Sequence, residues 1–122
     1  DRLDTDILGA SRAGIASALV LTGIDRPKHV LAAPEGSRPD FILSDLRGLH
    51  EPYPAAQELD GGVKVGRSVV RVESNGDVRI LAEGDSHIDL VRAGAKAIWA
   101  SGMGIFVLRV PELLYADPFH RP

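Results

Sequence analysis

The stretch Asp1–Gly23, DRLDTDILGASRAGIASALVLTG, decides the fold of the first half of the chain. Residues Thr5–Ala13 predict a helix, because capping residues lie at its start and Gly14 suits the left-handed position just beyond its end. Residues Ser17–Leu21 are a continuous run of small and apolar side chains, closed by Thr-Gly, which is typical of a strand buried on both faces. A helix that leads into a buried strand indicates the α/β class.

Helix and strand signals keep alternating after this stretch. Residues Asp25–Ala33 predict a second helix, whose first turn tolerates Pro27. Residues Phe41–Leu43 predict a second short buried strand. Ser44 or Asp45 is expected to cap a last short helix that runs to His50. The alternation predicts the trailing part of an α/β parallel sheet.

A change of composition separates the two halves of the chain. Residues 1–60 carry ten acidic and six basic side chains, whereas residues 61–122 carry seven acidic and eight basic ones. The stretch Glu51–Gly62 contains two prolines and ends in a Gly pair, which favours a linker or a domain boundary. We therefore expect a core portion at 1–52, a linker at 53–62 and a separate module at 63–122.

The second half predicts a small α+β module. The dipeptide Asn75-Gly76 is a strong hairpin signal, because both residues tolerate positive φ. Ser86 is a suitable N-cap and Gly102 a suitable C-terminal stop for one amphipathic helix. In chain order we expect strands within 63–72 broken at Gly66, a turn at 74–77, a strand at 78–82, the helix from Ser86 to Gly102 and a strand at 105–110.

The composition excludes several classes of protein. The chain has 122 residues, 44% of them hydrophobic and 25% charged, which is typical of a folded protein. It has no cysteine, so disulfides, thiolate zinc sites and cysteine nucleophiles are excluded. The net charge of -3 gives no reason to expect a nucleic-acid partner, and no apolar run approaches the roughly 20 residues that span a bilayer.

The first residues of the chain give an expectation about its cellular location. No targeting segment is recognisable, which is typical of a cytoplasmic protein. The sequence opens on Asp1, and its single methionine is Met103. We therefore expect that these residues are a piece of a longer polypeptide.

Two carboxylates, Asp1 and Asp6, flank the start of the first predicted helix. In an open α/β sheet, ligands bind outside the carboxyl ends of the strands, next to the helices that follow. Carboxylates at this edge suit Mg²⁺, a hard cation that takes oxygen ligands and often bridges to a phosphate. On spacing alone, the favoured interpretation is that Asp4, Thr5 and Asp6 only cap the helix, where acids stabilise the first turn.

Four quoted segments carry a family resemblance. They are DRLDTDILGA at the start, the Ala13-Gly14 pair, ALVLTG at 18–23 and RPDFILSDL at 38–46. Together they resemble the fourth motif and the following strands of haloacid dehalogenase (HAD)-type phosphatases. The resemblance covers about residues 1–50 and is closest to the branch of p-nitrophenyl-phosphatase-like enzymes and actinobacterial glycerol-3-phosphate phosphatases.

The resemblance implies a function and a metal. Asp1 matches the aspartate that ligates the essential Mg²⁺, and Asp6 matches the second acid, which supports the metal site or its water shell. The family hydrolyses small phosphate monoesters through an aspartyl-phosphate formed on an aspartate nucleophile. Glycerol 3-phosphate is the favoured substrate.

The chain departs from the family pattern in what it lacks. The nucleophile motif, the phosphate-binding strand end, the lysine motif and the cap domain all precede the fourth motif in the family. Asp4-Thr5-Asp6 spells the nucleophile pattern but follows no apolar strand, and Lys28 lies downstream of the fourth motif. No catalytic residue is therefore assigned here, and we expect the isolated chain to be inactive and to need the remainder of the same polypeptide, both core and cap.

The second module resembles the small C-terminal extension of actinobacterial glycerol-3-phosphate phosphatases, which is GNAT-like (related in fold to acetyltransferases). The segments that carry this resemblance are the Val-rich hairpin, LVRA at 90–93 and AKAIWA at 95–100. The Gly102–Gly104 pair follows the helix and lacks the Arg or Gln that cofactor-binding acetyltransferases place before it. We therefore expect a structural or interaction appendage. The alternatives are an independent non-enzymatic binding module and, less favoured, a GNAT-type acyltransferase.

The remaining candidates indicate no site. Trp99 is expected to anchor its helix in the core. Three arginines of the hairpin region, Arg67, Arg71 and Arg79, are expected on a solvated face, although they suit an anion. No two histidines stand at metal-ligand spacing among His29, His50, His87 and His120.

Overall fold

The computed structural model describes residues 3–119, apart from the side chains of Asp4 and Thr5. The chain divides into two compact units. Unit 1 comprises the chain up to Tyr53 together with the segment that begins at Ala116, and unit 2 comprises Pro54–Tyr115. Unit 2 is therefore inserted into the chain of unit 1, with a covalent connection at each end.

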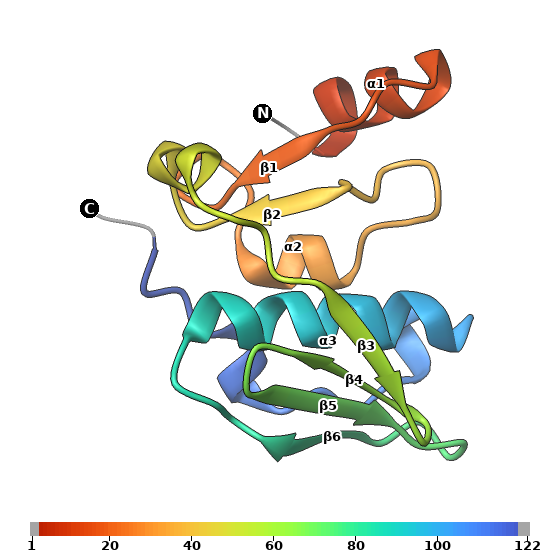
Figure 1. Cartoon of the computed structure of the whole chain (residues 1–122). Coiled ribbons are helices and arrows are strands. Elements are labelled where there is room, and N and C mark those ends of the chain that lie inside the picture. The colour runs from red at the N-terminus through yellow and green to blue at the C-terminus, as the bar shows by residue number, and fades with distance from the viewer. Residues whose placement is uncertain (1–2, 120–122) are drawn as a thin grey trace. The chain divides into compact units, whose positions relative to one another are not determined.

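Unit 1 is built around a two-stranded parallel sheet (Figure 1). Strand β1 pairs with β2 in the register Ala18↔Phe41, Leu19↔Ile42 and Val20↔Leu43. The pairing confirms the predicted parallel sheet, and Leu19, Ile42 and Leu43 are buried. The elements are, in order, η1 (Leu3–Ile7), α1 (Leu8–Ala13), β1 (Ala18–Val20), α2 (Pro27–Leu31), β2 (Phe41–Leu43) and η2 (Leu46–His50).

The first helical segment begins earlier than the sequence predicts. The π-helical turn η1 starts at Leu3 and continues into α1, and Gly14 ends α1 with φ 72°. Leu3 and Ile7 are buried one turn apart, so this pair fixes which face of the turn meets the core. The prediction that Asp4 or Thr5 caps a helix from Thr5 is wrong, because an N-cap residue has extended backbone and both residues already lie in the helical turn.

The other ends of elements in unit 1 follow their local signals. Pro27 occupies the first turn of α2, where its missing N–H costs no hydrogen bond. Asp45 caps η2, a 3₁₀-helix, by accepting the Arg47 amide hydrogen at 2.8 Å. Of the two predicted caps, Asp45 is the one confirmed.

Unit 2 is a four-stranded antiparallel sheet in the order β3-β4-β5-β6, with α3 across one face (Figure 1). Ser86 caps α3 by accepting the Asp89 amide hydrogen, and Gly102 ends it with φ 71°. The predicted strand at Val78–Ala82 and the predicted helix are confirmed. The elements are β3 (Ala56–Leu59), β4 (Gly62–Val65), β5 (Ser68–Val72), β6 (Val78–Ala82), α3 (His87–Ser101), η3 (Ile105–Val107) and η4 (Glu112–Tyr115).

Residues predicted as a linker form a strand. Strand β3 lies inside the segment 53–62 and pairs with β4 from Ala56↔Val65 to Leu59↔Gly62. All four β3 residues are exposed, so the strand has no buried apolar face that a sequence pattern can reveal. Backbone hydrogen bonds to β4 form it, and Gly61, with φ 74°, makes the turn between them.

The strand predicted at Ile105–Val110 is wrong. Residues Ile105–Val107 form a 3₁₀ turn, and Phe106 is 98% exposed. Only Arg109 meets the sheet, through an isolated bridge to Asp77. A short apolar run predicts a buried strand, but this segment makes a single bridge and leaves Phe106 and Val107 exposed.

The hairpin between β5 and β6 forms at the predicted place with a different turn. The Glu73 carbonyl accepts the Gly76 amide hydrogen, and the Glu73 amide donates to the Asp77 carbonyl. Gly76 has φ 96°, whereas no non-glycine residue of the described chain has positive φ. The loop therefore has three residues, Ser74 to Gly76, with the left-handed conformation at Gly76 alone.

Taken together, the described chain has a mixed α/β fold made of one parallel and one antiparallel sheet. Within residues 3–119, no helix has the length and apolar character needed to cross a membrane.

Candidate functional site

The candidate site lies at the carboxyl edge of the parallel pair in unit 1. Because Val20 pairs with Leu43, the residues that follow β1 and those that follow β2 emerge at the same edge. The arrowheads of β1 and β2 point the same way in Figure 1. This is the edge at which open α/β sheets bind ligands.

Of the two predicted metal-site acids, the structure describes one. Asp1 lies outside the described residues, so its assignment as a Mg²⁺ ligand stays a prediction. Asp6 lies in η1, and its side chain is exposed while its neighbour Ile7 is 1% exposed. The turn therefore buries its apolar residues and presents the Asp6 carboxylate to solvent.

Asp25 ties the start of η1 to the carboxyl edge. This residue follows β1, and its Oδ2 accepts the amide hydrogen of Leu3 at 2.8 Å. The first N–H groups of a helix have no partner within the helix, and a carboxylate there also meets the positive end of the helix dipole. Asp25 therefore supplies the cap predicted at Asp4 or Thr5. Sequence reasoning placed Asp25 at the start of α2 and missed this contact.

A short chain of contacts continues from Asp25 into α2. The Nδ1 atom of His29 lies 3.8 Å from Asp25 Oδ1 and accepts the amide hydrogen of Arg26 at 2.9 Å. Because Nδ1 accepts, the neutral imidazole carries its proton on Nε2. Arg26 in turn places Nη1 3.1 Å from Asp117 Oδ2. The sequence carried no signal for this pairing, because Arg26 and Asp117 are 91 positions apart.

Beyond β2, Asp45 and Arg47 form a close charged pair. Arg47 Nη2 lies 2.6 Å from Asp45 Oδ2, and Arg47 Nε also donates to both carboxylate oxygens. The hydrogen bond to Asp45 is the main cause that raises the pKa of Arg47 above its usual value. A cavity of about 290 Å³ lies beside this pair, lined by Thr22, Ser44, Asp45, Arg47, Pro118 and Phe119.

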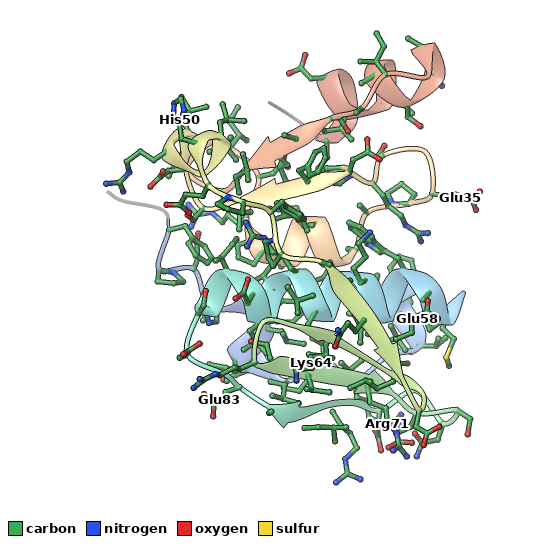
Figure 2. All side chains as sticks on the ribbon, in the orientation of Figure 1. Glu35, His50, Glu58, Lys64, Arg71 and Glu83 are labelled. Carbon is green, nitrogen blue, oxygen red and sulfur yellow. The ribbon has the colours of Figure 1, made fainter. Side chains whose placement is uncertain are left out.

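The described side chains do not form a metal-binding cluster by themselves. Among the side chains that the structure describes, which leave out Asp4 and Thr5, no three His, Asp or Glu gather closely enough to hold a metal ion. His120 lies outside the described residues, and His50 is on η2 (Figure 2). Of the two acids that the sequence predicts at a metal site, Asp6 is therefore the one that the structure describes. A complete metal site needs further ligands.

The arginines of unit 2 pair with acids. Arg71, labelled in Figure 2, and Arg79 face each other across β5 and β6, and both approach Glu73, at 3.2 Å and 4.0 Å. Arg67 lies 3.8 Å from Asp85, and both side chains are largely exposed. The three arginines lie on a solvated face, as the sequence predicts, and their ion pairs with Glu73 and Asp85 are a finding of the structure.

Comparisons with known proteins agree with the geometry of unit 1. Residues 1–49 match the family described as HAD-hydrolase-like. Over 102 residues, the chain is 41% identical to D-glycerol 3-phosphate phosphatase from Mycobacterium tuberculosis (strain ATCC 25618 / H37Rv). That match covers 81% of this chain and 29% of the phosphatase. The chain thus spans less than a third of the length of this curated relative.

Two solved structures are similar to the chain. A glycerol phosphate phosphatase from M. tuberculosis in complex with magnesium matches with a TM-score of 0.62 and 36% identity, over 82% of this chain and 30% of that one. The same protein in complex with calcium matches with a TM-score of 0.67 and 30% identity, over 100% of this chain and 38% of that one. The mixed α/β fold is therefore similar to part of a phosphatase that binds divalent cations.

Proposed function

We propose that these residues are the C-terminal part of a Mg²⁺-dependent HAD-type phosphatase, which hydrolyses small phosphate monoesters, glycerol 3-phosphate foremost. The observation that carries the proposal is the 41% identity to a D-glycerol 3-phosphate phosphatase, which extends over 81% of the chain and thus over both units. The match of residues 1–49 to HAD-like hydrolases supports the same assignment.

The open sheet of unit 1 supports the view that more strands precede it. Parallel sheets are stable when both faces and most edges are covered, and two parallel strands do not achieve this. The outer edge of β2 is capped, because the Ile42 amide, which faces away from β1, donates to the Tyr53 hydroxyl at 2.9 Å. Further strands would therefore join at the free edge of β1.

The residues present fit a supporting part in metal binding. Asp6 offers carboxylate oxygens on an exposed turn, the donor chemistry that Mg²⁺ takes. Asp1 would ligate the ion, Asp6 would hold its water shell, and Asp25 would fix the turn between them through Leu3. When bound, Mg²⁺ would neutralise charge on the phosphoryl group. The aspartate that forms the aspartyl-phosphate would lie in the preceding part of the polypeptide.

For unit 2 we propose a GNAT-like structural or interaction appendage. Its Gly102 is the C-terminal cap of α3, with a left-handed backbone. A cofactor pyrophosphate binds at a helix N-terminus, where free N–H groups and the positive dipole end meet it. The Gly-x-Gly of this chain follows the other end of a helix, which disfavours the acyltransferase alternative.

The proposal is tested with the polypeptide that contains this chain. We expect Mg²⁺-dependent release of phosphate from glycerol 3-phosphate, and no turnover by residues 1–122 alone. Asp1→Asn should lower kcat/KM by about 100-fold or more, because a direct metal ligand is lost, and Asp6→Asn by about 10-fold.

The matched control is Asp85→Asn, which removes an acid that is 73% exposed in unit 2 and should leave the activity unchanged. Turnover by the isolated residues 1–122, or full activity of Asp1→Asn, would contradict the proposal.

A further inference from the structure

The segment Ala116–Phe119 belongs to unit 1 although the whole of unit 2 separates it from β2 in the sequence. Its Asp117 places Oδ2 3.1 Å from Arg26 Nη1, and the two side chains are 14% and 46% exposed. Arg26 is the N-cap residue of α2, in the loop that follows β1. An ion pair therefore fastens the end of the described chain beside the carboxyl edge.

Beyond Asp117, the segment reaches the cavity at that edge. Pro118 and Phe119 line it together with Thr22, which follows β1, and with Ser44, Asp45 and Arg47, which follow β2. The wall supplied by the parallel strands is polar and charged, whereas Pro118 and Phe119 supply an apolar wall. The cavity of about 290 Å³ is thus built from three stretches of chain that are far apart in sequence.

We infer that Ala116–Phe119 is an ionically fastened strap, which closes one wall of the carboxyl-edge cavity and is held there by the pair Asp117–Arg26. A partly exposed ion pair contributes little free energy and is screened by salt. Breaking this pair therefore loosens the strap over the cavity. The strap itself is inferred from the structure, and its place beside the sheet edge of a phosphatase rests on the proposed function.

Disulfide trapping tests the strap without an activity assay. Because residues 1–122 contain no cysteine, any cysteine elsewhere in the full polypeptide is first changed to serine. Thr22→Cys combined with Phe119→Cys should then form a disulfide on mild oxidation, read as loss of maleimide-reactive thiols. Ser44→Cys with Pro118→Cys is the second pair, in case the first variant does not fold.

The matched control pair is Ser17→Cys with Phe119→Cys. Ser17 lines a different cavity, at the amino end of β1, and the extended segment from Ser17 to Val20 alone spans about 10 Å before the turn that holds Thr22. A disulfide requires Cα atoms within about 7 Å. A fastened strap therefore cross-links to Thr22 and not to Ser17.

The ionic fastening is tested by charge reversal in the cross-linking background. Asp117→Arg should slow disulfide formation about fivefold, the size expected of a partly exposed ion pair, and so should 1 M KCl. Adding Arg26→Asp to Asp117→Arg should restore the rate.

Failure of both folded cysteine pairs to cross-link, equal cross-linking of the Ser17 control, or an unchanged rate in Asp117→Arg would each overturn the strap. Cross-linking as expected in a polypeptide without Mg²⁺-dependent phosphatase activity would overturn the proposed function alone.

Discussion

Single carboxylates organise both units through contacts with groups distant in sequence. Asp25 accepts the Leu3 amide hydrogen 22 positions away and so holds the turn that carries Asp6. In unit 2, Asp77 accepts hydrogen bonds from Arg109 and from Asn75, while Arg109 Nη2 also donates to the Asn75 carbonyl at 2.8 Å. Asp25 thus holds the start of η1, and Asp77 holds the segment around Arg109, in which Phe106 and Val107 are exposed.

The Asp77–Arg109 contact makes a prediction about pH. The hydrogen bond from Arg109 is the main cause that lowers the pKa of Asp77 below its usual value. A lowered folded-state pKa contributes stability above the unfolded pKa of about 3.9, and this is lost as pH falls through the folded pKa. We expect Arg109→Gln to raise the pKa of Asp77 and to remove the stability that Asp77 contributes above a pH of about 3.9, so that the stabilities of the two proteins converge as pH falls.

The measurement is a carboxyl NMR titration of Asp77 in both proteins. Arg67→Gln is the matched control, because Arg67 pairs with Asp85 and should leave the pKa of Asp77 unchanged. An Asp77 titration that is identical with and without Arg109 would rule out this account.

Among the elements, the turns at glycine set the geometry of unit 2. Gly76 closes the β5–β6 hairpin with φ 96°, and a Cβ there would lie 2.5 Å from the Val107 carbonyl oxygen. Gly102 ends α3 with φ 71°, but a Cβ there meets nothing within 4 Å. A residue with a side chain would therefore be strained by the positive φ at either position. Only at Gly76 would its Cβ also lack space.

This difference gives a paired prediction. Gly102→Ala should lower the free energy of unfolding by about 1 kcal/mol, the cost of left-handed backbone for a residue with a side chain. Gly76→Ala should lower it by about 2–4 kcal/mol, because overpacking adds about 1–3 kcal/mol. Urea denaturation of both variants measures the losses, and equal losses would show that the Val107 carbonyl moves aside freely.

At the scale of the whole molecule, the two units differ in how complete their folds are. Unit 2 has four antiparallel strands and a 15-residue helix, with Val65, Val70, Leu90 and Val91 buried. Unit 1 has a parallel pair in which Phe41 of β2 is exposed, and Leu46 and Leu49 of η2 are exposed as well. Two strands are too few for an independently stable sheet, whereas three or more with a packed helix suffice.

We therefore predict that residues 54–115 fold when expressed alone and that residues 1–53 do not. Proton–nitrogen correlation spectra of the two fragments measure this, with dispersed amide signals expected only for residues 54–115. Dispersed signals from residues 1–53 alone would contradict the view that unit 1 is the outer part of a larger sheet.

What the sequence determined by itself is the local structure and the family resemblance. Asp45 and Ser86 cap the starts of their helices, and Gly14 and Gly102 cap the ends of theirs, as expected, because a cap depends on backbone groups within a few positions. Strands β1 and β2 were predicted because their continuous apolar runs mark burial on both faces. The match of residues 1–49 to HAD-like hydrolases agrees with the motif around Asp1 and Asp6.

Features that depend on partners distant in sequence follow from the three-dimensional fold. Strand β3 exists because β4 pairs with it, and the apolar run at 105–107 is a turn because no strand receives it. The contacts of Asp25 with Leu3 and of Asp117 with Arg26 span 22 and 91 positions. A side chain carries no local trace of a partner so far along the chain, since folding alone brings the two together.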